Sequence, residues 1–110
     1  RLVFQSSPQV ASVLGRGYQR QWLFIDGDNI EHVQVARAFM KEKTDTRRVI
    51  LVSGSVEQTQ KALQKRVWFD QAGVLIQKLR IESLPAFVEM TSMGVTVTER
   101  PASFFLKDEN

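Results

Sequence analysis

The sequence of 110 residues is long enough for one domain with its own core, and its 43% hydrophobic and 25% charged residues are ordinary values for globular proteins. It contains no cysteine, which excludes disulfides, thiol catalysis and thiolate metal sites in this sequence but does not decide the compartment. The formal charge of +3 comes from 15 scattered basic residues against 12 acidic ones, so we expect a solvated basic surface, with a patch for an acidic partner or nucleic acid as the weaker alternative.

Residues 1–20 are interpreted as an N-terminal extension. The apolar run Leu2 to Phe4 predicts at most one edge strand, and the serine, proline and glycine residues after it predict a loop. Because the sequence begins with Arg1 rather than Met, we expect this extension to follow a missing upstream region. The expected organisation is an extension at 1–20, one domain at 21–100 and a C-terminal tail at 101–110. No apolar run approaches the roughly 18 residues of a membrane-spanning helix.

A strand-helix-strand unit is predicted first in the domain. Trp22–Ile25 and Val49–Val52 are continuous apolar runs, typical of strands buried on both faces of a parallel sheet. Between them a helix is expected to begin at Asp28, with Glu31 completing a capping box, and to end near Lys43. Its inward stripe is predicted to be Ile30, Val33, Ala36 and Met40.

A second helix and a third parallel strand are predicted next. Ser55 and Gln58 form a capping box that opens a helix extending to about Lys65. Val67–Phe69 then suits a short strand, and we interpret both tryptophans, Trp22 and Trp68, as core residues. The predicted inward stripe of this helix is Val56, Thr59, Ala62 and Leu63.

The stretch Val67–Met90 organises the second half of the chain. Asp70 is expected to form a turn or a cap before a short helix that places Leu75, Ile76 and Leu79 on one side. Leu84 precedes Pro85 and is therefore excluded from the helical region, so a strand is expected from Ala86 to Met90. A hairpin then leads to a strand at Val95–Thr98, which Arg100-Pro101 ends, and Phe104, Phe105 and Leu106 are expected to pack back on the domain.

The order helix, loop, X-Pro and strand resembles thioredoxin-like domains, in which this proline is cis. The runs WLFIDGDNIEHVQVA, VILVSGS, KALQKRVWFDQ and LPA resemble the C-terminal region of TraW, a pilus-assembly protein of F-type conjugative type IV secretion systems. The resemblance extends from Gln21 to about Val88. It implies an α/β, thioredoxin-like three-layer domain with a mixed sheet of four to five strands, a cis Leu84-Pro85 bond, and a positive φ at Arg80, where related chains carry glycine.

The TraW resemblance also implies a function. It indicates a non-catalytic periplasmic factor of pilus assembly that works with a TrbC-like, itself thioredoxin-like, partner and with other periplasmic transfer proteins. In active relatives of this fold the loop after the first strand and the cis-proline loop receive an extended peptide. We therefore expect the partner surface here, with no catalytic residue, cofactor, metal or nucleic acid. The candidate partner-binding residues are Asp26, Asp28, Asn29, Trp68, Leu84 and Pro85.

Two alternatives remain open. FIDGDN resembles the first motif of NYN/PIN-like ribonucleases, which bind Mg²⁺ through several aspartates, and VSGS resembles a later motif of that family. Ser55, however, stands where that family has an aspartate, so turn formation and capping are the simpler interpretation of Asp26 and Asp28. The second alternative is another redox-inactive thioredoxin-like binding module. His32, the only histidine, has no catalytic partner at a suitable spacing and is interpreted as a surface residue.

Overall fold

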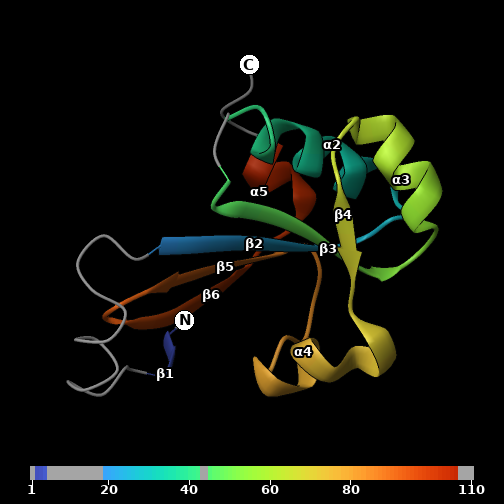
Figure 1. Cartoon of the computed structure of the whole chain (residues 1–110). Coiled ribbons are helices and arrows are strands. Elements are labelled where there is room, and N and C mark those ends of the chain that lie inside the picture. The colour runs from blue at the N-terminus through green and yellow to red at the C-terminus, as the bar shows by residue number, and fades with distance from the viewer. Residues whose placement is uncertain (1, 5–18, 43–44, 107–110) are drawn as a thin grey trace.

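The structure is a computed structural model, and it describes residues 2–4, 19–42 and 45–106 (Figure 1). Its strands are β1 (Leu2–Phe4), β2 (Gln19–Asp26), β3 (Arg47–Ser53), β4 (Val67–Phe69), β5 (Ala86–Thr91) and β6 (Gly94–Glu99). Its helices are α2 (Ile30–Phe39), α3 (Val56–Leu63), the 3-10 turn η1 (Gln71–Gly73), α4 (Val74–Lys78) and α5 (Ala102–Leu106).

The strands form one mixed sheet in the order β1-β6-β5-β2-β3-β4. β2, β3 and β4 are parallel neighbours, whereas β5, β6 and β1 are joined by antiparallel pairing. Figure 1 shows α2, α3 and α5 on one face of the sheet and α4 on the other. The predicted three-layer α/β fold with a mixed sheet is confirmed. The sheet has six strands rather than four to five, because Leu2–Phe4 pairs with β6 and adds an edge.

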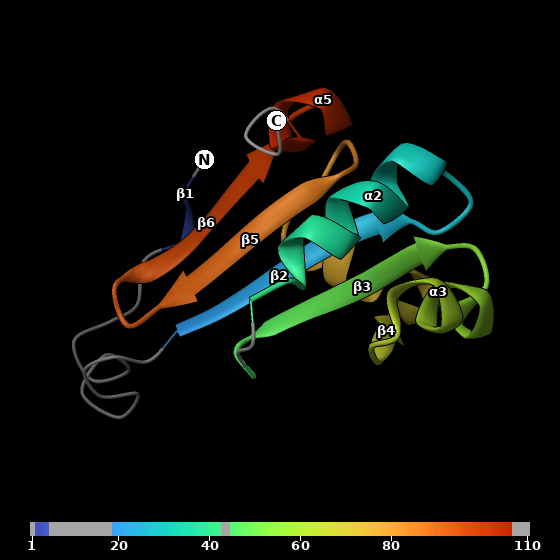
Figure 2. The ribbon, with the colours of Figure 1, turned by 90° about the horizontal axis from the view of Figure 1, so that it is seen from above.

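Each face of the sheet buries its own apolar cluster, because neighbouring residues of a strand point to opposite faces. Leu23 and Ile25 pack under α2 and α5, while Phe24 between them packs on the side of α4. All three side chains are at most 1% exposed, which confirms the prediction that β2 is buried on both faces. Figure 2 shows α2 lying over the middle of the sheet, with α3 beside β4 and α5 beyond the end of β6.

Helix α2 begins one residue later than predicted. Asn29, not Asp28, is the N-cap, and its Oδ1 accepts hydrogen bonds from the backbone N–H groups of Glu31 at 2.9 Å and His32 at 3.2 Å. The helix also ends at Phe39, earlier than the predicted Lys43. The inward face also differs from the prediction. Of the predicted stripe only Ala36 is fully buried, Ile30 is 75% exposed, and the other buried positions are His32 and Val35.

Helix α3 confirms its predicted cap. Ser55 Oγ accepts a hydrogen bond from the backbone N–H of Gln58 at 3.1 Å, and Thr59 and Leu63 are buried as expected. Ala62 is exposed, so its place in the predicted stripe is wrong. The helix ends at Leu63 because Gln64 adopts a left-handed conformation with φ 54°.

Asp70 and Arg80 define the two ends of the segment that contains α4. Asp70 is 3% exposed, and its two carboxylate oxygens accept hydrogen bonds from the N–H groups of Leu75 at 2.8 Å and Ile76 at 3.0 Å, which confirms the predicted capping role. Arg80 has φ 56°, as predicted from the resemblance. The Ile81 N–H donates to the Ile76 carbonyl, and the Arg80 N–H donates to the Gln77 carbonyl. These are the two hydrogen bonds of a Schellman motif at a helix C-terminus.

The Leu84-Pro85 peptide bond is cis, as the resemblance implied. After it, β5 and β6 form the predicted hairpin, in which Thr91 pairs with Gly94. Helix α5 follows Pro101. Phe105 and Leu106 pack against the cluster under α2, as predicted, whereas Phe104 is 51% exposed and the prediction is wrong for that side chain.

Candidate partner-binding site

The loop between β2 and α2 is held in place by Asp26. Its Oδ1 accepts a hydrogen bond from the Asp28 N–H at 2.9 Å and one from the Ser53 hydroxyl at 2.8 Å, so one carboxylate fixes its own loop and joins it to the end of β3. These hydrogen bonds favour the ionised form, led by the one from Asp28, and they lower the pKa of Asp26 below its ordinary value of 3.8. Asp28 and Asn29 are left exposed at the tip of the loop.

His32 lies under this loop and is not a surface residue as predicted. The residue is 9% exposed, and its Nδ1 accepts a hydrogen bond from the Asp26 N–H at 3.1 Å. Burial disfavours the charged ring and lowers the pKa of His32, which outweighs the opposing effect of the Asp26 and Glu31 carboxylates. The neutral imidazole therefore joins the start of α2 to the end of β2. The apolar residues Val35, Ala36 and Phe39 share a helical spacing with position 32, and this is the sequence signal that would have placed His32 on the inward face.

The loop after β3 packs directly against the loop after β2. Gly54 has φ +94°, and a Cβ built on it would lie 2.9 Å from the Cα of Gly27. A Cβ on Gly27 would in turn lie 2.9 Å from Oγ1 of the buried Thr59. The two loops can approach this closely only because both residues lack a side chain. The close packing makes this edge of the sheet a fixed surface.

The segment before β5 lies beside the same edge. Ala86 pairs with Phe24 in the antiparallel β2–β5 ladder, so Leu84 and Pro85 run alongside the last residues of β2. Pro85 is fully buried and Leu84 is half-buried against the cluster around α4. The backbone N–H groups of residues 82 and 83 donate hydrogen bonds to the Glu99 carboxylate, and these bonds attach the segment to the end of β6.

Trp68 lies apart from the other candidate residues. It lies on β4, where it pairs with Ile50 of β3. Strands β3 and β2 lie between β4 and β5, which puts β4 about 14 Å from β5 at the usual strand spacing. The Trp68 ring is half-buried on the side of α4, with the guanidinium groups of Arg48 and Arg66 at 4.7 and 5.0 Å from its centre. Its surroundings are therefore basic and aromatic, unlike the acidic loop.

The structure thus brings Asp26, Asp28, Asn29 and Leu84 to one edge of the sheet, while Pro85 contributes buried backbone and Trp68 lies on β4, separated from β5 by β2 and β3. Sequence reasoning missed His32 beneath this edge and Arg47 at the opposite end of α2. Within residues 2–4, 19–42 and 45–106, His, Cys, Asp and Glu side chains do not gather in threes as a metal ion would require. In the same ranges, no helix has the length and apolar character needed to cross a membrane.

Comparisons with known proteins show what this chain is similar to. No protein-family model matches it. Protein TraW of Escherichia coli (strain K12) is 46% identical to it over 68 residues, which cover 59% of this chain but only 30% of TraW. A crystal structure of thioredoxin from Wuchereria bancrofti aligns with a TM-score of 0.46 and 15% identity, covering 86% of this chain and 76% of that one. The match to TraW confirms the resemblance that the motifs indicated: this chain is similar to a part of TraW and spans 30% of its length.

Proposed function

We propose that this chain is the partner-binding domain of a non-catalytic pilus-assembly factor in F-type conjugative type IV secretion. The observation that carries the proposal is the 46% identity to TraW over 68 residues, within a chain that spans 30% of the length of that relative. The factor acts in the periplasm. It binds a TrbC-like pilus-assembly protein and positions it for assembly rather than converting a substrate.

The proposed contact surface is the edge formed by Asp28, Asn29 and Leu84, next to the half-buried Asp26 carboxylate that holds the loop. Its two loops are held by hydrogen bonds that the Asp26 and Glu99 carboxylates accept and by the close approach of Gly27 and Gly54. A surface fixed in this way loses little conformational entropy when a partner binds. The exposed Asp28 carboxylate supplies charge, and Leu84 supplies an apolar contact beside it.

The ribonuclease alternative is not favoured by the geometry of Asp26. A divalent cation would have to compete for the oxygen that already accepts hydrogen bonds from Asp28 and Ser53. Ser55, in the place of that family's aspartate, uses its hydroxyl to cap α3. The interpretation as another redox-inactive binding module uses the same surface and differs only in the partner.

To test the proposal, the gene for the full-length protein is deleted in donor cells, and DNA transfer and pilus formation are then measured. Both are expected to fall to the level of donors without a transfer system and to be restored by the full-length protein supplied in trans. The Asp26→Asn variant keeps a side-chain acceptor for the Asp28 N–H. It should therefore restore transfer, whereas a metal-dependent nuclease would lose function with that carboxylate. Unchanged transfer after deletion would contradict the proposal.

A further inference from the structure

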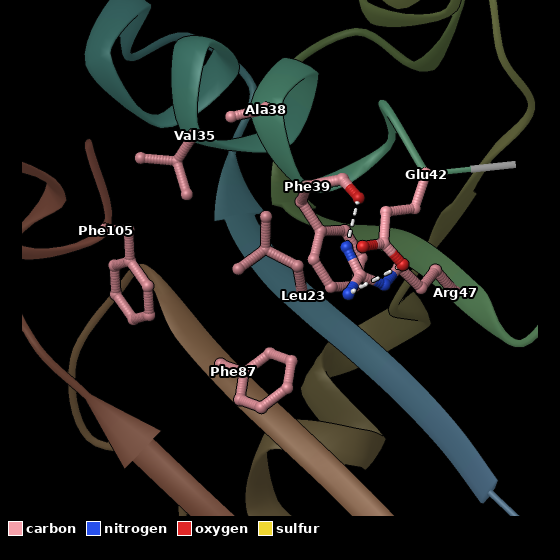
Figure 3. Close-up of a pocket in the computed structure, with 8 residues that line it drawn as sticks. All are labelled: Leu23, Val35, Ala38, Phe39, Glu42, Arg47, Phe87 and Phe105. Atoms are coloured by element: carbon pink, nitrogen blue, oxygen red, sulfur yellow. Dashed lines mark hydrogen bonds and ion pairs between the residues drawn. The ribbon is translucent and has the colours of Figure 1, made fainter. Parts of the chain in front are cut away.

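A pocket of about 510 Å³ lies at the C-terminal end of α2 (Figure 3). Its apolar wall consists of Leu23, Val35, Phe39, Phe87 and Phe105, which come from β2, α2, β5 and α5. The volume lies within the range of about 300–1,000 Å³ that ligand-binding pockets occupy. Phe39, at the C-terminal end of α2, is far from the Asn29 cap, so the pocket is distinct from the proposed contact edge.

Arg47 places a positive charge in this apolar pocket. Figure 3 shows the Arg47 side chain lying beside Phe39, and its guanidinium carbon is 4.8 Å from the centre of that ring. Nε donates to Gln21 Oε1 at 3.0 Å and Nη1 to the Phe39 carbonyl at 2.7 Å. These two neutral acceptors fix the orientation of the guanidinium without neutralising its charge, and the Arg47 side chain is only 20% exposed.

The countercharge of Arg47 is held loosely. Glu42 Oε2 lies 3.5 Å from Nη2, and the Glu42 side chain is 70% exposed. An ion pair with so exposed a partner contributes little, and the carboxylate can leave for solvent at small cost. Glu42 therefore shows where a carboxylate binds at the rim, next to the phenylalanine rings of the pocket wall.

We propose that this pocket receives a large apolar side chain of a protein partner, and that Arg47 binds an aspartate or glutamate next to that side chain in the partner. Glu42 swings aside when the partner carboxylate arrives. The apolar wall supplies affinity and the fixed guanidinium supplies selectivity for an acidic neighbour. The inference does not depend on the proposed role in pilus assembly, since it concerns a second surface and only the chemistry of its occupant.

Three blocked tetrapeptides test it directly: acetyl-Gly-Phe-Asp-Gly-amide, its Asn analogue, and its Ala-Asp analogue. Titrated into the ¹⁵N-labelled chain, the Phe-Asp peptide should shift the resonances of Phe39, Phe87 and the Arg47 Nε–H with a Kd on the order of 1 mM. The Asn analogue should bind at least about threefold more weakly, because it lacks the charge. The Ala-Asp analogue should not bind measurably.

Variants of the rim give effects of opposite sign. Glu42→Gln removes the competing carboxylate and should tighten binding of the Phe-Asp peptide about twofold or more. Glu57→Gln is the matched control, since Glu57 is similarly exposed and pairs with Lys61 on α3, and it should have no effect. Ala38→Met extends a side chain from the half-buried pocket wall while keeping a good helix former, and it should abolish binding.

The proposal fails if the Phe-Asp and Asn peptides bind equally, if the shifts lie away from the pocket, or if Glu42→Gln weakens binding. Decanoate serves as a separate probe. Its binding together with failure of every peptide would identify the pocket as a site for a lipid-like carboxylate and would overturn the assignment to a protein partner.

Discussion

Removal of the Asp70 carboxylate should destabilise the domain strongly, because this one side chain holds the start of α4. The carboxylate is buried and bonds two N–H groups in the first turn of the helix, those of Leu75 and Ile76. A hydrogen bond to a charged group contributes about 1.5–3 kcal/mol, but Leu75 and Ile76 are half-buried, so water reaches the freed groups in part. We expect Asp70→Ala to lower the free energy of unfolding by about 2–3 kcal/mol.

Urea unfolding followed by circular dichroism measures this loss. Asp70→Asn keeps the shape and one acceptor, so it should lose about half as much, while Asp28→Asn on the exposed loop should stay within about 0.5 kcal/mol of the parent. In NMR spectra the Leu75 and Ile76 amide protons should exchange faster in Asp70→Ala. A loss below about 0.5 kcal/mol for Asp70→Ala, with unchanged exchange, would show that α4 is held by its apolar contacts alone.

Three further predictions concern Arg80, His32 and Gly54. Arg80→Gly relieves a positive φ and should be neutral or stabilising by up to about 1 kcal/mol in urea unfolding; clear destabilisation would refute a strained Arg80. His32 has a lowered pKa in the fold, so the unfolded chain binds a proton on this ring more readily than the folded chain does. The free energy of unfolding should therefore be highest above about pH 6.5 and fall as the pH drops below that value. His32→Asn keeps an acceptor for the Asp26 N–H and should flatten this dependence. A parent curve as flat as that of His32→Asn would disprove the buried neutral ring. Position 54 has φ +94°, and the methyl group of Gly54→Ala would meet the backbone of Gly27, so this variant should lower the free energy of unfolding by about 1–3 kcal/mol. Thermal unfolding would detect this loss, and an unchanged melting temperature would show that the two loops can separate freely.

Short stretches of sequence predicted the parts of the fold that depend on local patterns. The apolar run of β2 indicated burial on both faces, Ser55 marked the start of α3, and Asp70 marked the turn before α4, because each is decided within a few residues. The cis Leu84-Pro85 bond and the positive φ of Arg80 came from the resemblance to TraW and thioredoxin-like domains, not from spacing.

Two separate features of α2 were predicted wrongly. Asp28 and Asn29 are both good N-cap residues, and Asp26 decides between them, because its carboxylate binds the Asp28 N–H and turns the chain one residue further. The inward face follows Val35, Ala36 and Phe39, whose helical spacing includes position 32, so Ile30 is exposed and His32 is buried.

The candidate site shows the same limit over longer distances. Asp26 and Leu84 lie at the same edge because β2 and β5 pair, and that neighbourhood was expected from the resemblance to thioredoxin-like domains. Trp68 was grouped with them on chemistry alone, and strand order separates it. Arg47 carried no local signal, because its neighbours Gln21, Phe39 and Glu42 become a binding site only when β2, β3 and α2 pack together.

Binding of the TrbC-like partner to loop variants of the full-length protein tests the central claim most directly. Leu84→Asp and Asp28→Lys, each confirmed as folded by circular dichroism, should weaken binding measured by titration calorimetry by about tenfold or more, or about 1.4 kcal/mol. Met93→Asp and Glu57→Lys make the same chemical changes at exposed positions elsewhere and should bind like the parent. Folded Leu84→Asp and Asp28→Lys proteins that bind as tightly as the parent would show that the partner does not contact this edge of the sheet.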